Sequence, residues 1–330
     1  MILPSQTSAR ARRLIALVFI FSFALHAGVK QDQYKLPAKL PTVRGDSTIV
    51  FVSDTQQPIF FEKLVLAEND NERATQLIFA SILQEHPNAV VHLGDMVAMG
   101  FDRYSWAPID TFRAQLRRLH IPLFPALGNH ELLLYTKHGE EAFTQRFPYV
   151  SKTGYSVRIG RLAVVILNSN ISKLTDAEEK DQESWYTATL STLEADTTIK
   201  MIAVGCHHSP FTNSTIVTPS EEIQHTYLPL FFQTKKCRLF VGGHAHASER
   251  FRIKGKDFFV VGGGGGLQQP LLIGEDQRWE DLTPLKARKR MFQYLSGKLT
   301  ATGLVLTVRM LKEDFTTFYD LYTLTIPWPE

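Results

Sequence analysis

Cysteine is scarce in this chain of 330 residues, which has only Cys206 and Cys237. Two cysteines do not make a disulfide framework, and neither belongs to a CxxC pair of the kind that binds zinc. Both lie at the ends of predicted strands, where they either pair in an oxidising compartment or stay as buried thiols. The sequence also has no repeat of fixed period. Its 44% hydrophobic and 21% charged residues are typical of a globular protein.

Without its N-terminal segment, the chain has no excess of charge of either sign. The formal net charge is +3, and residues 1–27 hold three arginines (Arg10, Arg12 and Arg13) and no acid. Without them, 33 basic residues face 33 acidic ones, so the charge does not indicate a nucleic-acid partner. The one basic cluster, residues 286–290, is more typical of a solvated helix face.

The N-terminus combines these arginines with an apolar run from Leu14 to Ala27. The run is shorter than the roughly 20 residues of a membrane span and is typical of a signal-peptide core. We therefore predict a signal peptide over residues 1–27, an extended leader over 28–46 and one domain over 47–330. The protein is expected to be exported to the periplasm or the extracellular space. The alternative is an uncleaved segment that anchors the protein in a membrane.

The glycine motifs of nucleotide-binding proteins are lacking. Residues 262–266 are five consecutive glycines, but no Lys-Ser/Thr follows as in a Walker loop, and no helical pattern follows as in a dinucleotide fingerprint. The run is either a loop that approaches the functional site closely, with N–H groups available to an anion, or a flexible turn.

Segments with strand and helix character alternate from residue 47 onward, which predicts an α/β architecture with helix-covered sheets. Strands are expected at 47–53, 89–93, 122–126, 155–159, 162–168, 200–205 and 238–241, and helices at 71–86, 109–120, 139–147, 175–195 and 221–233. The C-terminal third is expected to be mostly strand, at 250–253, 258–261, 303–311 and 315–325. These last strands suggest a second, mixed or antiparallel sheet.

Five short segments rich in metal-ligand side chains directly follow predicted strands. They are Ser53-Asp54-Thr55-Gln56, Gly94-Asp95, Gly128-Asn129-His130-Glu131, His207-His208-Ser209-Pro210 and Gly243-His244-Ala245-His246. Loops beyond strand C-termini converge in open α/β sheets, so these side chains are expected to meet. A pair of divalent cations about 3.5–4 Å apart needs a bridging carboxylate and several oxygen and nitrogen donors. The mixed donor set suits Mn, Fe, Zn or Co better than calcium.

In this order the segments resemble the calcineurin-like metallophosphoesterase pattern, D-x-H … GD … GNH(D/E) … H … GHxH. The resemblance runs from Asp54 to His246, and the GNHE and GHAH endings with Glu249-Arg250 look most like the purple-acid-phosphatase branch. It implies a four-layer α/β/β/α sandwich with a dinuclear metal site between its two sheets.

The resemblance also implies roles for individual residues. The expected ligands are Asp54 and His246 for the first metal, Asn129 and His244 for the second, and Asp95 for both. One of His207 and His208 would complete the second site. His207 is favoured because it comes first at the strand end, whereas an alignment on His-Ser-Pro favours His208. His130 would be the acid that meets the leaving-group oxygen.

Three positions depart from the family pattern. Gln56 stands where the family usually has His. An amide oxygen is a weaker and harder ligand than imidazole, so the first metal is expected to be held less tightly or to be a harder ion. Ala98 stands in place of the metal-binding Tyr of the purple enzymes, so their charge-transfer colour is not expected. Ser248 stands in place of a second Tyr.

We therefore predict a metal-dependent hydrolase of small-molecule phosphate esters, in the first place a phosphomonoesterase. Its expected cofactors are two divalent or trivalent ions, Fe, Mn or Zn, and its expected catalytic residues are Asp95, Asn129 and His130. The alternatives are a phosphodiesterase or nuclease that uses the same site, and a non-catalytic binding module of the same fold. Membrane contact is expected only through the N-terminal segment, if it is not cleaved.

Overall fold

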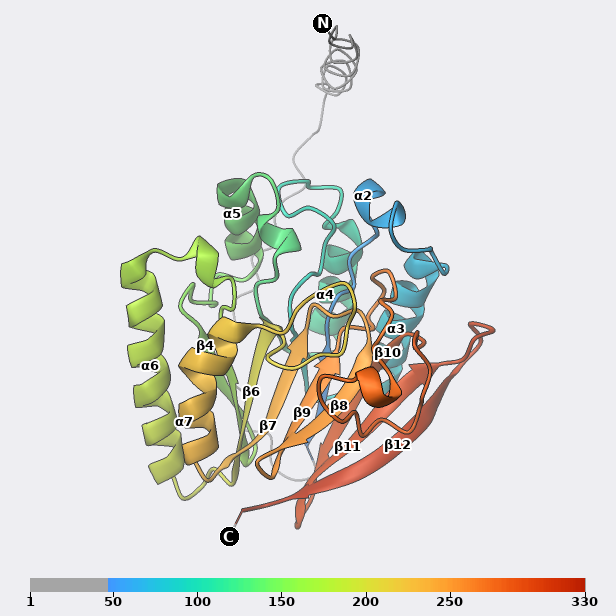
Figure 1. The fold of residues 1–330 in the computed structure, drawn as a ribbon. Coiled ribbons are helices and arrows are strands. Elements are labelled where there is room, and N and C mark those ends of the chain that lie inside the picture. Colours follow the sequence, from blue (N-terminus) through green and yellow to red (C-terminus); the bar gives the residue numbers. More distant parts are fainter. Residues whose placement is uncertain (1–46, 330) are drawn as a thin grey trace, which may run out of the picture. The chain divides into compact units, whose positions relative to one another are not determined.

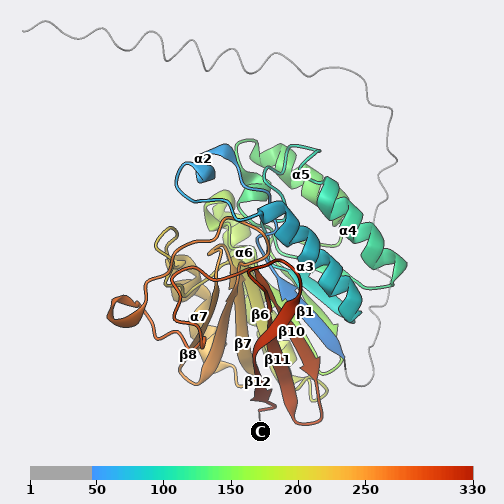
Figure 2. The same cartoon turned by 90° about the vertical axis from the view of Figure 1, so that its right-hand side faces the viewer.

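A computed structural model describes residues 47–329 of the chain, and the predicted signal peptide and leader lie outside these described residues. Residues 47–329 form two six-stranded sheets that lie face to face, with helices on the outer face of each sheet (Figures 1 and 2). The predicted α/β/β/α sandwich is confirmed. Among the helices of this described part, none has the length and apolar character that a membrane span requires.

The first sheet has the strand order β12-β11-β10-β1-β2-β3. Its strands are β1 (Thr48–Val52), β2 (Ala89–His92), β3 (Leu123–Pro125), β10 (Gln293–Leu299), β11 (Gly303–Leu311) and β12 (Phe318–Pro327). Strands β1, β2 and β3 are parallel, whereas β10, β11 and β12 pair antiparallel with their neighbours. The carboxyl ends of β1, β2 and β3 therefore lie at the same edge of the sheet.

The second sheet has the order β4-β5-β6-β7-β9-β8. Its strands are β4 (Tyr155–Ile159), β5 (Leu162–Ile166), β6 (Met201–His208), β7 (Cys237–Gly243), β8 (Ser248–Ile253) and β9 (Lys256–Val261). The neighbouring pairs β5–β6, β6–β7 and β7–β9 are parallel. Strands β6 and β7, which carry four of the predicted histidines at or just beyond their ends, are neighbours in the middle of this sheet.

Helices cover the outer faces of both sheets. The first sheet packs against α3 (Asn71–Glu85), α4 (Ala107–Arg118) and α5 (Thr136–Arg146), and the second packs against α6 (Asp176–Ala195) and α7 (Leu228–Gln233). The short helix α2 (Phe60–Lys63) buries none of its residues, and a π-helical turn (Ile223–Tyr227) precedes α7. The predicted capping box opens α6, where the Thr175 hydroxyl accepts from Glu178 N and the Glu178 carboxylate accepts from Thr175 N.

Strand β1 shows why a continuous apolar run is needed here. Ile49 and Phe51 face the core between the two sheets, whereas Val50 and Val52 face the helices α3 and α4. All four side chains are fully buried. A strand that is covered on both faces has no solvent side, so it does not alternate between apolar and polar residues.

The C-terminal third differs from the expectation of a separate second sheet. Strands β8 and β9 extend the second sheet beside β7, and β10, β11 and β12 extend the first sheet beside β1. Strand β10 was not predicted, because its sequence QYLSGKL contains Ser, Gly and Lys instead of a continuous apolar run. It is nevertheless mostly buried because it lies between β1 and β11.

The two cysteines are separate buried thiols. Cys206 lies on β6 and Cys237 on β7, and both are free. In the register of the two strands, Cys237 pairs with Ile202 while Cys206 pairs with Gly242, so the two side chains are offset along the sheet. Burial raises the pKa of the Cys237 thiol to about 12, which keeps it protonated and unreactive.

Candidate metal centre

Three of the predicted ligands follow strand ends in an unusual backbone conformation. Asp54 after β1, Asp95 after β2 and His244 after β7 have φ angles of 59°, 51° and 68°. This left-handed region is uncommon for residues other than glycine, and such residues concentrate at functional sites. Hydrogen bonds hold the turns, including Asp54 N to Gly94 O at 3.1 Å and His244 N to both carboxylate oxygens of Asp54 at 3.0 and 3.1 Å.

Glycines beside the ligands allow these loops to approach one another. A Cβ atom at Gly128 would lie 2.3 Å from Oδ1 of Asp95, and one at Gly243 would lie 2.0 Å from Oγ of Ser53. Nonbonded heavy atoms are not found so close together, so any side chain at either position would push the loops apart. The glycines in the GNHE and GHAH motifs are thus explained by close approach between neighbouring strand ends.

The first cluster of ligand atoms consists of Asp54, Asp95 and His246, whose carboxylate and ring atoms lie within 4.8 Å of one another. All three residues are buried, and His246 Nε2 lies 3.4 Å from Oδ1 of Asp54. Gln56 is buried beside them. When its amide nitrogen donates to the carbonyl oxygens of Asp95 and Asp54, at 3.0 and 3.3 Å, its oxygen lies 3.1 Å from His246 Nε2.

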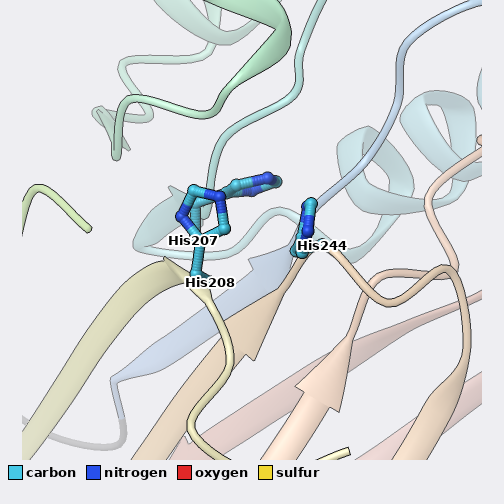
Figure 3. A group of neighbouring side chains, drawn as sticks. All are labelled: His207, His208 and His244. Atoms are coloured by element: carbon cyan, nitrogen blue, oxygen red, sulfur yellow. The ribbon is translucent and has the colours of Figure 1, made fainter. Parts of the chain in front are cut away.

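The second cluster consists of His207, His208 and His244, whose rings gather at the ends of β6 and β7 (Figure 3). Asn129 joins this cluster, because its Oδ1 lies 2.9 Å from His207 Nε2. The same Nε2 atom lies 3.2 Å from Oδ2 of Asp95. Asp95 therefore belongs to the first cluster and also contacts the second.

Backbone carbonyls fix the orientation of two of the imidazole rings. His207 Nδ1 lies 2.9 Å from Leu93 O, and His246 Nδ1 lies 2.9 Å from Leu267 O. A carbonyl oxygen only accepts, so Nδ1 carries the hydrogen and, in a neutral ring, Nε2 presents its lone pair. Metal-binding histidines usually have this arrangement, in which the second nitrogen donates to an oxygen. In both rings, Nε2 is the atom that faces the carboxylates.

His208 is held differently. Its Nδ1 lies 2.9 Å from Oγ of Ser169, and the same hydroxyl accepts from the His208 backbone N–H at 2.9 Å. Its ring centroid lies 4.5 Å from that of His244. Burial, together with the neighbouring His207, lowers the pKa of His208 to about 3, so its imidazole is neutral at physiological pH.

The electrostatics of the two clusters suit the binding of cations. Burial alone would raise the pKa of Asp95, but His207 and His130 hold this pKa well below its ordinary value. Burial likewise opposes charge on His207, yet Asp95 raises its pKa to about 9. Burial, and then the neighbouring His208 and His207, hold the pKa of His244 well below its usual value. The site thus offers an ionised carboxylate next to buried imidazoles.

These residues fit a pair of metal ions. Ligand bonds of about 2.0–2.2 Å place adjacent donor atoms of one ion roughly 3 Å apart, and the contacts between His207, Asn129, Asp95, Asp54 and His246 measure 2.9–3.4 Å. Carboxylates as deeply buried as those of Asp54 and Asp95 are costly to ionise without a positive partner. A bound cation would satisfy them, and the mixed oxygen and nitrogen donor set suits a first-row transition metal.

His130 lies at the edge of the two clusters. Its backbone N–H donates to Oδ1 of Asp95 at 2.8 Å, and its Nδ1 lies 2.8 Å from Ala98 O. Its Nε2 lies 4.0 Å from Oδ2 of Asp95 and 3.7 Å from Oε1 of Glu62 on α2. The ring is therefore fixed at one nitrogen and directs the other towards the site. The contact with Glu62 was not predicted, because no sequence pattern links α2 to the GNHE segment.

Glu131 is a second residue whose role the sequence did not reveal. Its Oε2 accepts from Asp95 N at 3.0 Å and Gly128 N at 2.8 Å, and its Oε1 accepts from Met96 N at 2.7 Å and Val97 N at 3.3 Å. The carboxylate is completely buried. It ties the loop after β2 to the loop after β3, and so positions both Asp95 and Asn129. The GNHE motif contained this residue, but its partners depend on the fold.

The five-glycine run packs tightly against the site. A Cβ atom at Gly264 would lie 2.1 Å from Ser53 O, and one at Gly266 would lie 2.6 Å from the His246 ring. The N–H groups of Gly264 and Gly266 donate to the carbonyls of Ser53 and Asp54 at 3.0 and 2.8 Å. The close-approach interpretation is therefore supported over that of a flexible turn. These two N–H groups stabilise the loop of Asp54 and are not directed at an anion.

The comparisons with known proteins agree with this geometry. Residues 47–248 match the family model described as calcineurin-like phosphoesterase. The sequence matches no curated protein. The fold is similar to that of purple acid phosphatase PPD1 from yellow lupin (Lupinus luteus) seeds, with 19% identity, a TM-score of 0.61, and coverage of 86% of this chain and 55% of the lupin chain. This chain thus spans little more than half the length of that phosphatase.

Two further solved structures are similar over almost their whole length. GAP50, described as the anchor in the inner membrane complex of Plasmodium, is 13% identical with a TM-score of 0.61, over 86% of this chain and 90% of its own. A dimetal phosphatase from Danio rerio is 14% identical with a TM-score of 0.51, over 84% and 98%. At such identities the likeness is one of fold. The family model, however, covers more than half of the chain and includes all five ligand segments, so this chain belongs to the calcineurin-like phosphoesterase family.

Proposed function

We propose that the protein is a dinuclear metal-dependent phosphomonoesterase that acts on a small-molecule phosphate ester. The observation that carries this proposal is the position of Asp95. Its carboxylate belongs to the cluster with Asp54 and His246 and lies 3.2 Å from Nε2 of His207 in the other cluster. A carboxylate shared by two donor sets is what a pair of closely spaced cations requires.

Each cluster would supply most of the ligands of one ion. The first ion would be held by Asp54, Gln56, Asp95 and His246, and the second by Asp95, Asn129, His207 and His244. When bound, such a pair polarises phosphoryl oxygens and lowers the pKa of water to about 7. His207 takes precedence over His208 because its Nε2 faces Asn129 and Asp95. His208 would lie beside the second ion as a neutral ring.

His130 would donate the proton that the leaving group needs. Its Nδ1 is held by Ala98 O, and Nε2 faces the site beside Asp95 and Glu62. A protonated ring in this orientation presents Nε2–H to the departing alkoxide, and a positioned acid contributes about 10²–10⁴-fold to a rate. The ester oxygen must therefore lie on the side of the site where α2 is found.

Metal analysis combined with a panel of esters tests the proposal. We expect two transition-metal ions per chain after reconstitution, and faster hydrolysis of p-nitrophenyl phosphate than of bis(p-nitrophenyl) phosphate. A preference for the diester would instead favour the phosphodiesterase alternative. Less than one metal per chain, without turnover of either ester, would contradict an enzymatic role and favour a binding module.

Export of the protein is a separate proposal. Its basis is the arginines before the apolar run of residues 14–27, which lie outside the described residues. Expression of the full chain followed by N-terminal sequencing of the product tests it. A mature start near residue 28 is expected, whereas an intact N-terminus in the membrane fraction would favour the anchor.

A further inference from the structure

The segment around α2 exposes four large apolar side chains, while its Glu62 side chain turns inward. Phe60, Phe61, Leu64 and Val65 are 67–73% exposed, and we call these four residues the apolar rim. Of the two charged side chains between them, Glu62 is half-buried and Lys63 is exposed. Glu62 is only 21% exposed and faces His130, and Lys63 pairs with Glu68 at 2.6 Å. A solvated surface turn has the opposite arrangement, with its apolar side chains inward.

The apolar rim adjoins the proposed reaction site. Glu62 lies within the same short helix, and its Oε1 lies 3.7 Å from Nε2 of His130. Its other carboxylate oxygen accepts from Ile59 N at 2.8 Å, so the helix and the contact with His130 are fixed by the same side chain. The segment that carries the apolar rim thus also places a side chain 3.7 Å from the atom that would meet the leaving-group oxygen.

A second exposed apolar group follows His130 along the chain. Leu134 is 74% exposed and Tyr135 is 52% exposed, and Leu134 adopts a left-handed backbone with a φ of 62°. An exposed leucine held in an unfavourable conformation is not explained by local packing. Both views place α2 and the start of α5 beyond the same end of the sheets, where the ligand-bearing loops lie (Figures 1 and 2).

Clustered exposure of this kind indicates a ligand. Single exposed apolar residues are normal on a protein surface, but contiguous groups mark binding sites. Here the exposed apolar residues border the expected position of the leaving group. The simplest ligand for them is therefore the organic part of the substrate itself. A large protein bound over the rim would cover the approach to His130. An extended hydrocarbon chain that begins at the ester oxygen could instead lie along the rim and leave the approach open.

We propose that the apolar rim binds the hydrocarbon chain of the substrate, and that the substrate is a phosphate monoester of a long-chain alcohol or lipid. This inference rests on the proposed phosphomonoesterase activity and specifies the class of its substrate. The phosphoryl group would occupy the metal site, the ester oxygen would lie at His130, and the chain would contact Phe60, Phe61 and Leu64. Cleavage breaks the P–O bond, water supplies the oxygen to phosphate, and His130 returns a proton to the released alcohol.

The chain-length dependence of hydrolysis by the full chain tests this inference. Each buried methylene is worth about a three- to fourfold change in affinity, so kcat/KM for dodecyl phosphate is expected to exceed that for butyl phosphate by at least about tenfold. The variant Phe60→Ser/Phe61→Ser should lose this ratio while retaining its rate on butyl phosphate. The matched control Tyr319→Ser removes an exposed aromatic residue from β12, and it should retain the ratio.

The outcomes separate the inference from the proposed function. Hydrolysis of butyl phosphate with no preference for the longer chain would overturn the inference alone. If neither ester is hydrolysed, binding of dodecyl phosphate and butyl phosphate is measured by calorimetry, and equal affinities would overturn the inference. Loss of self-association in the double variant, with the chain-length ratio unchanged, would assign the rim to contacts between copies of the chain and would also overturn it.

Discussion

The Nε2 atom of His207 lies 3.2 Å from Oδ2 of Asp95, although one residue ends a strand of the second sheet and the other follows a strand of the first. This contact joins the two sheets at the proposed metal site. Its neighbour His208, one residue further along, has Nδ1 2.9 Å from the Ser169 hydroxyl, and its ring centroid lies 4.5 Å from that of His244. Adjacent histidines at one strand end are thus placed for different tasks.

Replacement of each histidine separately should reveal this difference. We expect His207→Ala to weaken the binding of one of the two metals by more than about tenfold and to reduce turnover accordingly. Replacement of residues that only hydrogen-bond to metal ligands already causes losses of this size. His208→Ala should retain both metals, since Asn129 and Asp95 both contact Nε2 of His207. Metal content after dialysis against a weak chelator measures the effect. His225→Ala, at an exposed position, is the control, and loss of metal in His208→Ala alone would reverse the assignment.

Glu131 should contribute to stability as well as to the site. In Glu131→Gln one carboxylate oxygen becomes an amide NH2, so either the N–H groups of Asp95 and Gly128 or those of Met96 and Val97 lose their acceptor. An unpaired buried donor costs roughly 1–3 kcal/mol. We therefore expect the free energy of unfolding, measured by urea titration, to fall by at least about 1 kcal/mol.

The exposed Glu183 provides the matched control for this change. Glu183→Gln makes the same chemical substitution on the outer side of α6 and should alter the free energy of unfolding by less than about 0.5 kcal/mol. Equal stability of the two variants would show that the Glu131 carboxylate does not hold the loops together.

The ligand segments could be predicted from the sequence because each is local. Asp54, Asp95 and His244 lie one to three residues beyond the ends of strands, and the carboxyl ends of parallel strands meet at one edge. The strands of the core were also predictable, since β1 and β5 are covered on both faces and are continuously apolar. The local sequence was sufficient to predict those features that depend on one segment alone.

The remaining features depend on distant partners. Strand β10 is buried because β1 and β11 flank it, and its own Ser, Gly and Lys do not show this. The contact between Glu62 and His130 and the four N–H groups at Glu131 arise only when separate loops converge. The left-handed backbone at Asp54 and Asp95 is likewise set by hydrogen bonds between strand ends.

Glu249 is expected to make stability depend on pH. Burial raises the pKa of its carboxyl to about 7, although Thr212 Oγ1 and Asn213 N donate to it, and Asp281 and Arg290 lie nearby with opposing effects. The folded state thus holds the proton more tightly than the unfolded state does. This stabilisation is complete below the ordinary pKa near 4.5 and is lost as the pH rises through about 7.

Thermal unfolding at pH 5 and pH 8 measures this effect. The pKa shift of Glu249 corresponds to at most about 3 kcal/mol. Through this group alone, the wild-type protein should be less stable at pH 8 than at pH 5 by an amount of that order. Glu249→Gln has no proton to lose and should show a smaller difference between the two pH values. An unchanged difference in the variant would show that Glu249 is ionised throughout.

The five-glycine run gives a final prediction, on whether close approach or flexibility requires glycine there. A Cβ atom at Gly264 would lie 2.1 Å from Ser53 O, next to the loop that carries Asp54. Gly264→Ala should therefore displace the end of β1, lower the free energy of unfolding by about 3 kcal/mol as in overpacked cores, and reduce the bound metal. In Gly274→Ala the added Cβ meets nothing within 4 Å, and only the φ of 65° opposes it, which costs roughly 1–2 kcal/mol. Urea unfolding and metal analysis of both variants decide the matter, because a merely flexible turn would tolerate alanine at residue 264 as well as at 274 and would leave the metals in place.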